Sequence, residues 1–382
     1  MKVGGRYHLT YCSNIHPGET WDQVSRSLAD ALPHVREAMA HAGPLAIGLR
    51  LSAQAAERLA AGDALRRFKD FLAAGDYYVP TINGFPYGAF HGERVKERVY
   101  LPDWRDAARV DYSNRLATLL ADLLSDRPEI VGSVSTAPGA FRAHVRSSED
   151  VDAIAAGLRR HAEHLRRLYE RTGRTIALAI EPEPACYIET VDDLVGFFGR
   201  HLPDDAVRRH VGVCFDACHM SVEFEEPMAA IARIEAAGLR IFKFQISSAL
   251  RIDAGRRDTL APALGRFADD TYLHQVVQRG AEGFVRYTDL PEALAAGGGD
   301  GEWRVHYHVP IFLGTLGALE TTQSDLVTLL DGLKRLDLSR GHVPCLEVET
   351  YTWDVLPPEH RNVDVCTAIA RELTWVRRQL EA

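Results

Sequence analysis

Short runs of apolar and β-branched residues recur along the chain, and most of them precede a segment in which apolar residues return every three or four positions. The first pattern is typical of buried strands, and the second is typical of helices that pack on one face. Nine runs are candidate strands: 7–12, 45–52, 77–84, 129–136, 175–182, 210–217, 241–248, 304–312 and 345–352. The clearest helical segments are 19–43, 147–173, 189–202 and 359–382.

Strand and helix alternate over the whole chain, with no Pro/Ser-rich linker. This alternation predicts parallel strands joined by helical crossovers. Eight repeats over 382 residues suit a closed (β/α)8 TIM barrel better than an open sheet. We therefore expect one α/β domain over residues 1–382, with an insertion in the seventh strand–helix unit near 249–303. The run 345–352 is favoured as the eighth strand because a terminal helix follows it, and 304–312 is expected to be an added strand or hairpin arm.

Composition excludes some classes of function. Hydrophobic residues make up 46% and charged residues 25% of the chain, as in ordinary globular proteins, and no apolar run approaches the length of a membrane helix. The net charge of −9 provides no basic field for binding nucleic acid. Six scattered cysteines match neither a disulfide framework nor a zinc-finger pattern, so buried free thiols are expected. Without an apolar signal core near the first residue, we expect a cytoplasmic protein.

Polar side chains gather where the predicted strands end, which is where the functional loops of a barrel begin. They are Asn14, His16, Asn83, Ser135, Thr136, Glu181, Glu183, Asp216, His219, Gln245, His306, His308, Glu347 and Glu349. Because side chains alternate along a strand, Glu181 and Asp216 should both project inward at the carboxyl end of the barrel. Converging carboxylates repel one another unless a cation offsets their charge, so a divalent metal ion is predicted.

A divalent ion in such a site polarises a carbonyl group while a spare carboxylate moves a proton. This is the chemistry of aldose–ketose isomerisation and epimerisation, and it makes Glu183 or Glu347 the candidate base. The alternative for Glu181 and Asp216 is a structural ion pair or helix cap. Asn14 and His16 could equally shape a turn, and the loop with His91 and Lys96 could be either a lid over the site or a solvated segment.

The strand ends resemble those of the xylose isomerase-like TIM barrels, which include sugar-phosphate isomerase/epimerases and ketose epimerases. The segments that carry the resemblance are "LAIEPEP", "CFDACH", "IFKFQIS" and "CLEVETYTW". The resemblance implies metal ligands at Glu181, Asp216 and either Glu347 or Glu349, with His219 in a D-x-x-H step. It places Gln245 where the family has a histidine, so either this amide or one of His306 and His308 would complete the set.

The resulting prediction assigns three roles to particular residues. Metal ligands are Glu181, Asp216, Gln245, His308 and Glu349; catalytic residues are Glu183, Glu347 and His219; and substrate-binding residues are His16, Asn83, His91, Lys243 and His306. The expected cofactor is a divalent ion, Mn²⁺, Mg²⁺, Zn²⁺ or Co²⁺, and the expected substrate is a small polyhydroxylated or carbonyl-bearing metabolite.

A closer resemblance covers nearly the whole chain. The blocks "HLTYCSNIHPGETW", "LRLSAQAAERL", "TINGFPYGAFHGERVKERVYLPDW", "YHVPIF" and "LEVETYTWDVLP" are similar to the metabolite traffic protein EboE family. This resemblance implies the handling or export of a secondary-metabolite precursor, with pathway proteins as partners. Two functions therefore stay open: a metal-dependent isomerase-like enzyme, and a non-catalytic carrier with an isomerase-like pocket. An abasic-site endonuclease shares the fold but would need a basic face and more imidazole ligands.

Overall fold

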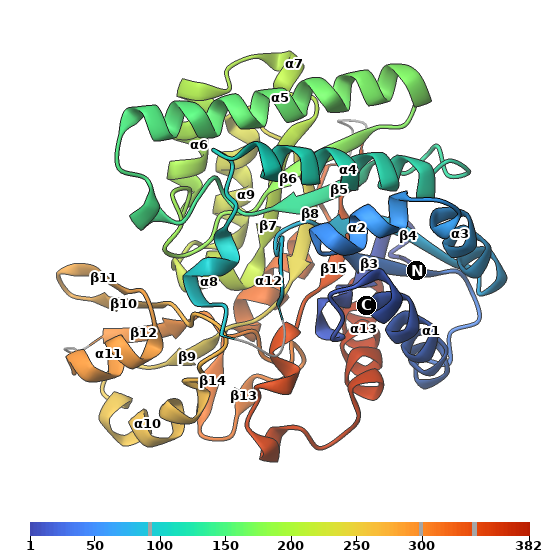
Figure 1. Ribbon diagram of the computed structural model, residues 1–382. Coiled ribbons are helices and arrows are strands. Elements are labelled where there is room, and N and C mark those ends of the chain that lie inside the picture. The colour runs from blue at the N-terminus through green and yellow to red at the C-terminus, as the bar shows by residue number, and fades with distance from the viewer. Residues whose placement is uncertain (91–93, 298–300, 338–341) are drawn as a thin grey trace.

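The computed structural model describes residues 1–90, 94–297, 301–337 and 342–382 (Figure 1). Over these residues the central sheet has nine strands in the order β1-β2-β15-β8-β7-β6-β5-β4-β3. The parallel strands are β2 (Tyr7–Tyr11), β3 (Leu45–Arg50), β4 (Tyr77–Asn83), β5 (Gly132–Thr136), β6 (Ile176–Ile180), β7 (Val211–Asp216), β8 (Ile241–Ile246) and β15 (Cys345–Val348). The short strand β1 (Lys2–Val3) pairs antiparallel with β2. A parallel bridge between Cys12 and Gly48 joins the β2 and β3 ends, so the sheet closes into the predicted TIM barrel.

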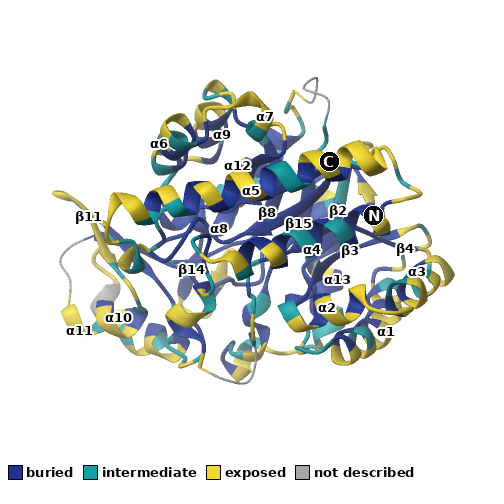
Figure 2. Cartoon of the chain, turned by 45° about the horizontal axis from the view of Figure 1, so that its top comes forward, coloured by how far each residue is buried: buried dark blue, intermediate teal, exposed yellow. Residues whose placement is uncertain are grey.

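Helices surround this barrel, with their inner faces buried and their outer faces exposed (Figure 2). The α-helices of the barrel are α1 (Trp21–Ala38), α2 (Ala53–Ala60), α3 (Ala64–Ala74), α4 (Ala107–Leu123), α5 (Ser148–Thr172), α6 (Val191–His201), α7 (Asp205–Arg208), α8 (Ala217–Val222), α9 (Pro227–Ala236), α12 (Gln323–Leu333) and α13 (Val365–Glu381). Short 3-10 turns are η1 (Ser13–Ile15), η2 (Lys96–Tyr100), η3 (Arg142–His144), η4 (Gly265–Phe267), η5 (Tyr351–Asp354) and η6 (Pro358–His360). Among the residues described, no helix has both the length and the apolar character that crossing a membrane requires.

Local sequence signals explain where the longer helices begin and end. Thr20 caps α1 in a reciprocal capping box with Gln23. Ser147 caps α5, which stops at Gly173, a residue in the left-handed conformation that glycine adopts without strain. These starts and the α5 stop match the sequence prediction, whereas α1 ends at Ala38, a few residues before the predicted Gly43.

A second, antiparallel sheet is inserted between β8 and β15 and lies beside the barrel at the lower left of Figure 1. It contains β9 (Leu250–Ile252), β10 (Val276–Gly280), β11 (Gly283–Tyr287), β12 (Gly301–Val305), β13 (Thr315–Leu316) and β14 (Leu319–Thr321), with α10 (Arg257–Leu264) and α11 (Leu290–Ala296) packed on it. The sheet continues past the predicted end at 303 because β14 returns to pair with β9.

The run predicted as an added strand at 304–312 is strand only at its beginning. The chain leaves β12 at Val305, and residues 306–312 run without regular structure. The eighth barrel strand is β15, as the following terminal helix predicted.

The lower interior of the barrel is filled by side chains. Ala177, Ala179, Cys214 and Phe242 form a small apolar cluster on the strands β6 to β8. Beside it, Lys243 Nζ lies 2.5 Å from Glu347 Oε1, and both side chains are fully buried. This packed interior leaves the carboxyl end of the barrel as the place for a site.

Candidate metal centre and its cavity

Three carboxylates from the strands β6, β7 and β15 converge at the carboxyl end of the barrel. Glu181 directly follows β6, Asp216 ends β7, and Glu349 directly follows β15. Each has an oxygen within 4.8 Å of an oxygen of the other two, and all three residues are buried. The Glu349 carboxylate is held in place by the side-chain amides of Asn14 and Asn83, which donate to its Oε1 at 2.8 and 2.9 Å.

The Asp216 carboxylate has one occupied oxygen and one open oxygen. Oδ1 accepts from the Ser247 hydroxyl at 2.7 Å and from the backbone N–H of His219 at 3.0 Å. Oδ2 has no hydrogen-bond partner among the residues that the structure describes, although it is fully buried. A buried carboxylate oxygen without a donor is costly, so Oδ2 is oriented for a ligand.

Two imidazoles next to these carboxylates have a fixed tautomer. His219 Nδ1 lies 3.0 Å from the carbonyl oxygen of Pro182, and His308 Nδ1 lies 2.7 Å from the carbonyl oxygen of Glu349. A carbonyl oxygen only accepts, so both Nδ1 atoms must carry the hydrogen. In the neutral rings the Nε2 atoms therefore carry lone pairs.

The third imidazole, that of His306, is fixed in the same way by Gln275. The Gln275 amide nitrogen donates to the Pro184 carbonyl oxygen, so its Oε1 faces His306 Nδ1 at 2.7 Å and accepts the hydrogen. His306 Nε2 lies 3.1 Å from His219 Nε2 and 3.3 Å from His308 Nε2. Three lone pairs at these distances repel one another unless a proton or a metal ion lies between them.

The pKa values agree with a site built for a cation. Burial, followed by the charges of Glu349 and Asp216, raises the pKa of Glu181 well above its usual range. Burial and the neighbouring carboxylates Asp216 and Glu347 raise the pKa of Glu349 to about 8. Burial alone would raise the pKa of Asp216, but the His219 and His308 rings, together with the hydrogen bonds from Ser247 and the His219 N–H, outweigh it, so its pKa lies below the usual value.

Burial also keeps His306 and His308 neutral. It lowers the pKa of His308 to about 4 and that of His306 well below its usual value. Carboxylate oxygens and neutral imidazole nitrogens are the donors that divalent Mg²⁺, Mn²⁺, Zn²⁺ or Co²⁺ ions accept in proteins. The donor set and the open Asp216 Oδ2 therefore fit a divalent metal ion.

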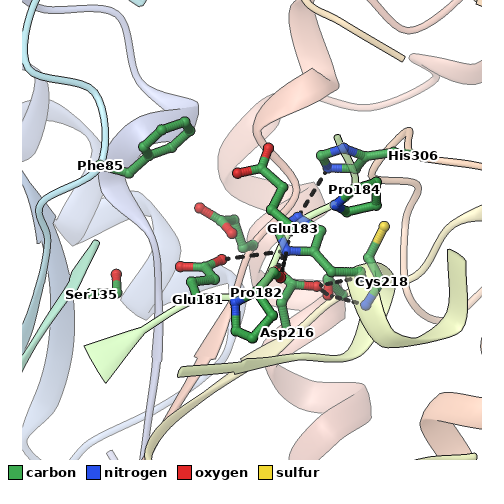
Figure 3. Close-up of polar contacts among 12 residues, drawn as sticks. Phe85, Ser135, Glu181, Pro182, Glu183, Pro184, Asp216, Cys218 and His306 are labelled. Carbon is green, nitrogen blue, oxygen red and sulfur yellow. Dashed lines mark hydrogen bonds and ion pairs between the residues drawn. The ribbon is translucent and has the colours of Figure 1, made fainter. Parts of the chain in front are cut away.

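A further carboxylate lies beside this cluster but is held differently. Glu183 has an oxygen within 4.8 Å of imidazole nitrogens of His219 and His306. Its Oε1 accepts a hydrogen bond of 2.7 Å from the Tyr100 hydroxyl, which in turn accepts from Gln275. Burial raises the pKa of Glu183, so this carboxyl group is poised to exchange a proton. Figure 3 shows Glu181, Glu183, Asp216 and His306 directed towards one space.

This space opens into a cavity with two kinds of wall. The base holds the polar residues Asn14, Asn83, Thr136, Glu181, Glu183, His219, His306, His308 and Glu349. The upper walls are mainly apolar and aromatic, with Phe85, Pro86, Phe90, Val95, Val99, Tyr100, Ala137, Tyr272, Leu273 and Tyr351, and with Lys96 among them. The inserted sheet thus completes a cavity that the barrel alone leaves open, since His306, His308, Tyr272 and Leu273 come from the insertion.

Eight of the predicted site residues meet at this cavity: Asn83, Glu181, Glu183, Asp216, His219, His306, His308 and Glu349. The predicted alternation of His306 and His308 along a strand does not apply, because both follow the end of β12. Their side chains nevertheless share the site. The Gln275 amide oxygen accepts from His306 Nδ1 and the Glu349 carbonyl oxygen accepts from His308 Nδ1, so both rings direct Nε2 into the site.

Three predicted residues lie elsewhere. Lys243 and Glu347 form their ion pair inside the barrel and are not among the residues that line the described cavity, so their expected roles of substrate binder and base stay predictions. His16 is hydrogen-bonded to the Tyr11 hydroxyl at 3.0 Å and lines a separate small cavity beside Arg50. The strand pattern could not separate Glu347 from Glu349, since both project to the same side of β15.

Two further predictions have different outcomes. Gln245 is fully buried on β8, where it pairs in register with Asp216 of β7 and Glu347 of β15. Its amide atoms have no hydrogen-bond partner within the described parts of the chain, so ligation by Gln245 stays a prediction. His91 lies outside the described residues.

Sequence reasoning missed Tyr100 and Gln275, which position Glu183 and His306. Tyr100 belongs to the long loop that was singled out as a lid candidate, so its aromatic composition was a signal. Gln275 precedes a strand of the inserted sheet, and no sequence signal marked it, since no barrel strand ends there.

Comparisons with known proteins extend this description. Residues 56–298 match the family model of the xylose isomerase-like TIM barrel. A comparison with curated proteins found no match.

Three solved structures are similar over nearly their whole length. A xylose isomerase-like TIM barrel protein from Mycobacterium smegmatis in complex with magnesium is 14% identical, with a TM-score of 0.55 and coverage of 100% of this chain and 99% of that chain. A D-tagatose 3-epimerase-like protein is 11% identical (TM-score 0.48), and the IOLI protein with a bound zinc atom is 12% identical (TM-score 0.45); coverage is 98% of both chains in each pair.

The family model covers well over half of the sequence, and its description agrees with the closed parallel barrel described above. The magnesium-bound structure independently supports the same fold. This chain therefore belongs to the xylose isomerase-like TIM barrel family.

Proposed function

We propose that this protein is a metal-dependent enzyme of the isomerase/epimerase type, which moves a proton next to the carbonyl group of a small metabolite. The observation that carries the proposal is the convergence of three buried carboxylates and three imidazoles on one space. Solved relatives described as magnesium-bound and as epimerase-like are compatible with this chemistry.

The proposed ligands are Glu181, Asp216 and Glu349, with His308 completing the set. Asp216 contributes its open Oδ2, while Ser247 and the His219 backbone hold the other oxygen. Asn14 and Asn83 orient Glu349. A divalent ion held there would polarise a substrate carbonyl group.

Glu183 is the proposed proton carrier. Burial raises its pKa, which favours a carboxyl group that both accepts and returns a proton. The Tyr100 hydroxyl fixes Oε1, and Oε2, which has the Cys186 thiol at 4.0 Å, is the oxygen proposed to meet the substrate. His219 lies between Glu183 and Asp216, and it can donate from Nε2 to a substrate hydroxyl once it has taken up a proton.

The resemblance to the metabolite traffic protein EboE family supports placing this reaction in a secondary-metabolite pathway. We accordingly propose that residues 1–382 act as one domain in the cytoplasm, with a metabolite as ligand and pathway proteins as partners.

One observation favours a second function, that of a non-catalytic carrier. The resemblance implies a histidine ligand on the seventh barrel strand, and the buried Gln245 stands there instead. A site with an altered ligand set can keep its ligand and lose its turnover.

Exchange in deuterated water distinguishes the two functions. We expect the metal-loaded protein to incorporate deuterium next to the carbonyl group of at least one member of a panel of hydroxyketones and aldoses, as measured by mass spectrometry of the recovered compound. Glu183→Gln should abolish exchange and keep the metal, while the exposed Glu163→Gln should leave both unchanged. Tight binding without exchange across the panel would contradict the enzyme and support the carrier.

A further inference from the structure

We infer that the ligand of this cavity has a compact oxygen-bearing head and an uncharged, apolar tail, so that it is neither a free sugar nor a sugar phosphate. The inference about the head rests on the proposed function, because the head is the part that meets the metal ligands and Glu183. The inference about the tail rests on the cavity wall, which is an independent observation.

The upper wall is made of two apolar clusters. Phe85, Val99 and Leu273 pack with Tyr100 on one side. Phe90, Val95 and Tyr272 form the other, with Tyr351 packed against them. Figure 3 shows Phe85 across the space from His306, so the apolar wall begins where the donor cluster ends.

Three polar groups near these walls already have partners in the protein. The Tyr100 hydroxyl donates to Glu183, the Tyr272 hydroxyl donates to the Phe90 carbonyl oxygen at 3.0 Å, and the Asn83 amide donates to Glu349. A polyhydroxylated tail would lose its water on entering and find few new partners, which costs free energy for each unpaired hydroxyl. An alkyl or aryl tail has no such cost.

The charges at the wall exclude a phosphate or carboxylate on the tail. Apart from the histidines, Lys96 is the cationic residue among the described residues that line the cavity. Its Nζ lies 2.6 Å from Asp289 and 3.1 Å from the Asp269 carbonyl oxygen. An anion would have to compete with Asp289 for the Lys96 charge. The cavity therefore selects a neutral tail.

Hydroxamic acids test the inference because they share one metal-binding head and differ only in the tail. We expect the metal-loaded protein to bind hexanohydroxamic acid about thirtyfold more tightly than gluconohydroxamic acid, which has the same carbon chain with hydroxyl groups, as measured by calorimetry. Equal binding, or tighter binding of gluconohydroxamic acid, would overturn the inference.

Variants locate the effect on the wall. Phe85→Ser and Leu273→Asn should each reduce the preference for the hexyl chain several-fold and leave the affinity for acetohydroxamic acid unchanged, which also shows that the variant is folded. Tyr169→Ser, on the exposed face of α5, is the matched control and should change neither affinity. An unchanged preference in both wall variants would contradict the assignment of the tail to these residues.

A ligand without a metal-binding head separates this inference from the proposed function. Hexan-1-ol should bind to the metal-free protein and lose affinity in Phe85→Ser. If hydroxamic acids bind only with metal but show no tail preference, the inference about the tail fails and the metal site stands. If hexan-1-ol binds to the wall while hydroxamic acids gain nothing from metal, the metal site fails and the tail inference stands.

Discussion

Lys243 and Glu347 form a buried ion pair inside the barrel, although their positions on the strands led us to expect them in the site. Both side chains are fully buried and contact each other at 2.5 Å, and Lys243 also donates to the Ser135 hydroxyl at 3.1 Å. The Glu347 charge raises the pKa of Lys243 against the opposing effect of burial, so the lysine stays charged. The pair therefore acts as a structural unit beneath the site.

Removing one partner should cost far more than removing both. Lys243→Met leaves Glu347 as an uncompensated buried charge and should lower the free energy of unfolding by about 3 to 5 kcal/mol. The double variant Lys243→Met/Glu347→Leu should recover most of that loss, as measured by urea unfolding. A double variant as unstable as the single one would contradict the role of the pair.

Glu372 provides a test of pH dependence away from the site. Its Oε1 accepts from the Thr350 hydroxyl at 2.8 Å and from the Ile311 N–H at 3.1 Å, and burial raises its pKa to about 7. Because the folded-state pKa is raised, its stabilising contribution is complete below pH 4.5 and is lost as the pH rises through 7.

Glu372→Gln should remove this loss while keeping the acceptor oxygen. The free energy of unfolding of the variant minus that of the native protein should rise by about 2 to 3 kcal/mol between pH 5 and pH 8.5. Urea unfolding in the presence of a chelator at both pH values measures the difference. Parallel pH profiles for variant and native protein would show that Glu372 does not titrate as described.

At the scale of the elements, closure of the barrel depends on one glycine. A Cβ atom at Gly48 would lie 1.5 Å from Glu347 Oε2 and 2.8 Å from the Tyr11 carbonyl oxygen. Gly48 also forms the bridge to Cys12 that joins the β2 and β3 ends. Any side chain there must displace either the buried ion pair or the closing strand.

Gly48→Ala should therefore lower the free energy of unfolding by about 3 kcal/mol or more through overpacking. Gly199→Ala is the matched control, because Gly199 lies in α6 with no atom within 4 Å of the added Cβ. That variant should gain up to about 1 kcal/mol from higher helix propensity. Equal stability of the two variants would contradict the crowding at Gly48.

The sequence pattern predicted the barrel strands well because each strand is apolar on the side that meets the helices. All eight barrel strands lie within the predicted runs, and β15 is the eighth. The inserted sheet was only partly predictable. Its strands are short, and β9 pairs with the distant β12 and β14, so neither the β9–β14 pairing nor the irregular path after Val305 has a local signal.

At the scale of the whole molecule, the site combines what the barrel and the insertion each supply. Glu181, Asp216 and Glu349 could be predicted because strand ends meet at the mouth of a barrel. The orientation of His306 and His308 could not, since Gln275 and a backbone carbonyl oxygen fix it from outside any strand. The apolar wall could not be predicted either, because it forms only where the loop after β4 packs against the insertion.

The central claim is that the converging carboxylates hold a divalent metal ion, and the metal content of the purified protein tests it most directly. After exposure to Mg²⁺, Mn²⁺, Zn²⁺ and Co²⁺ and dialysis, elemental analysis should find about one equivalent of bound divalent metal per chain. Glu181→Gln and Asp216→Asn should lose the metal, whereas the exposed Glu163→Gln should retain it. Unchanged metal content in both site variants, or no bound metal in the native protein, would contradict the account.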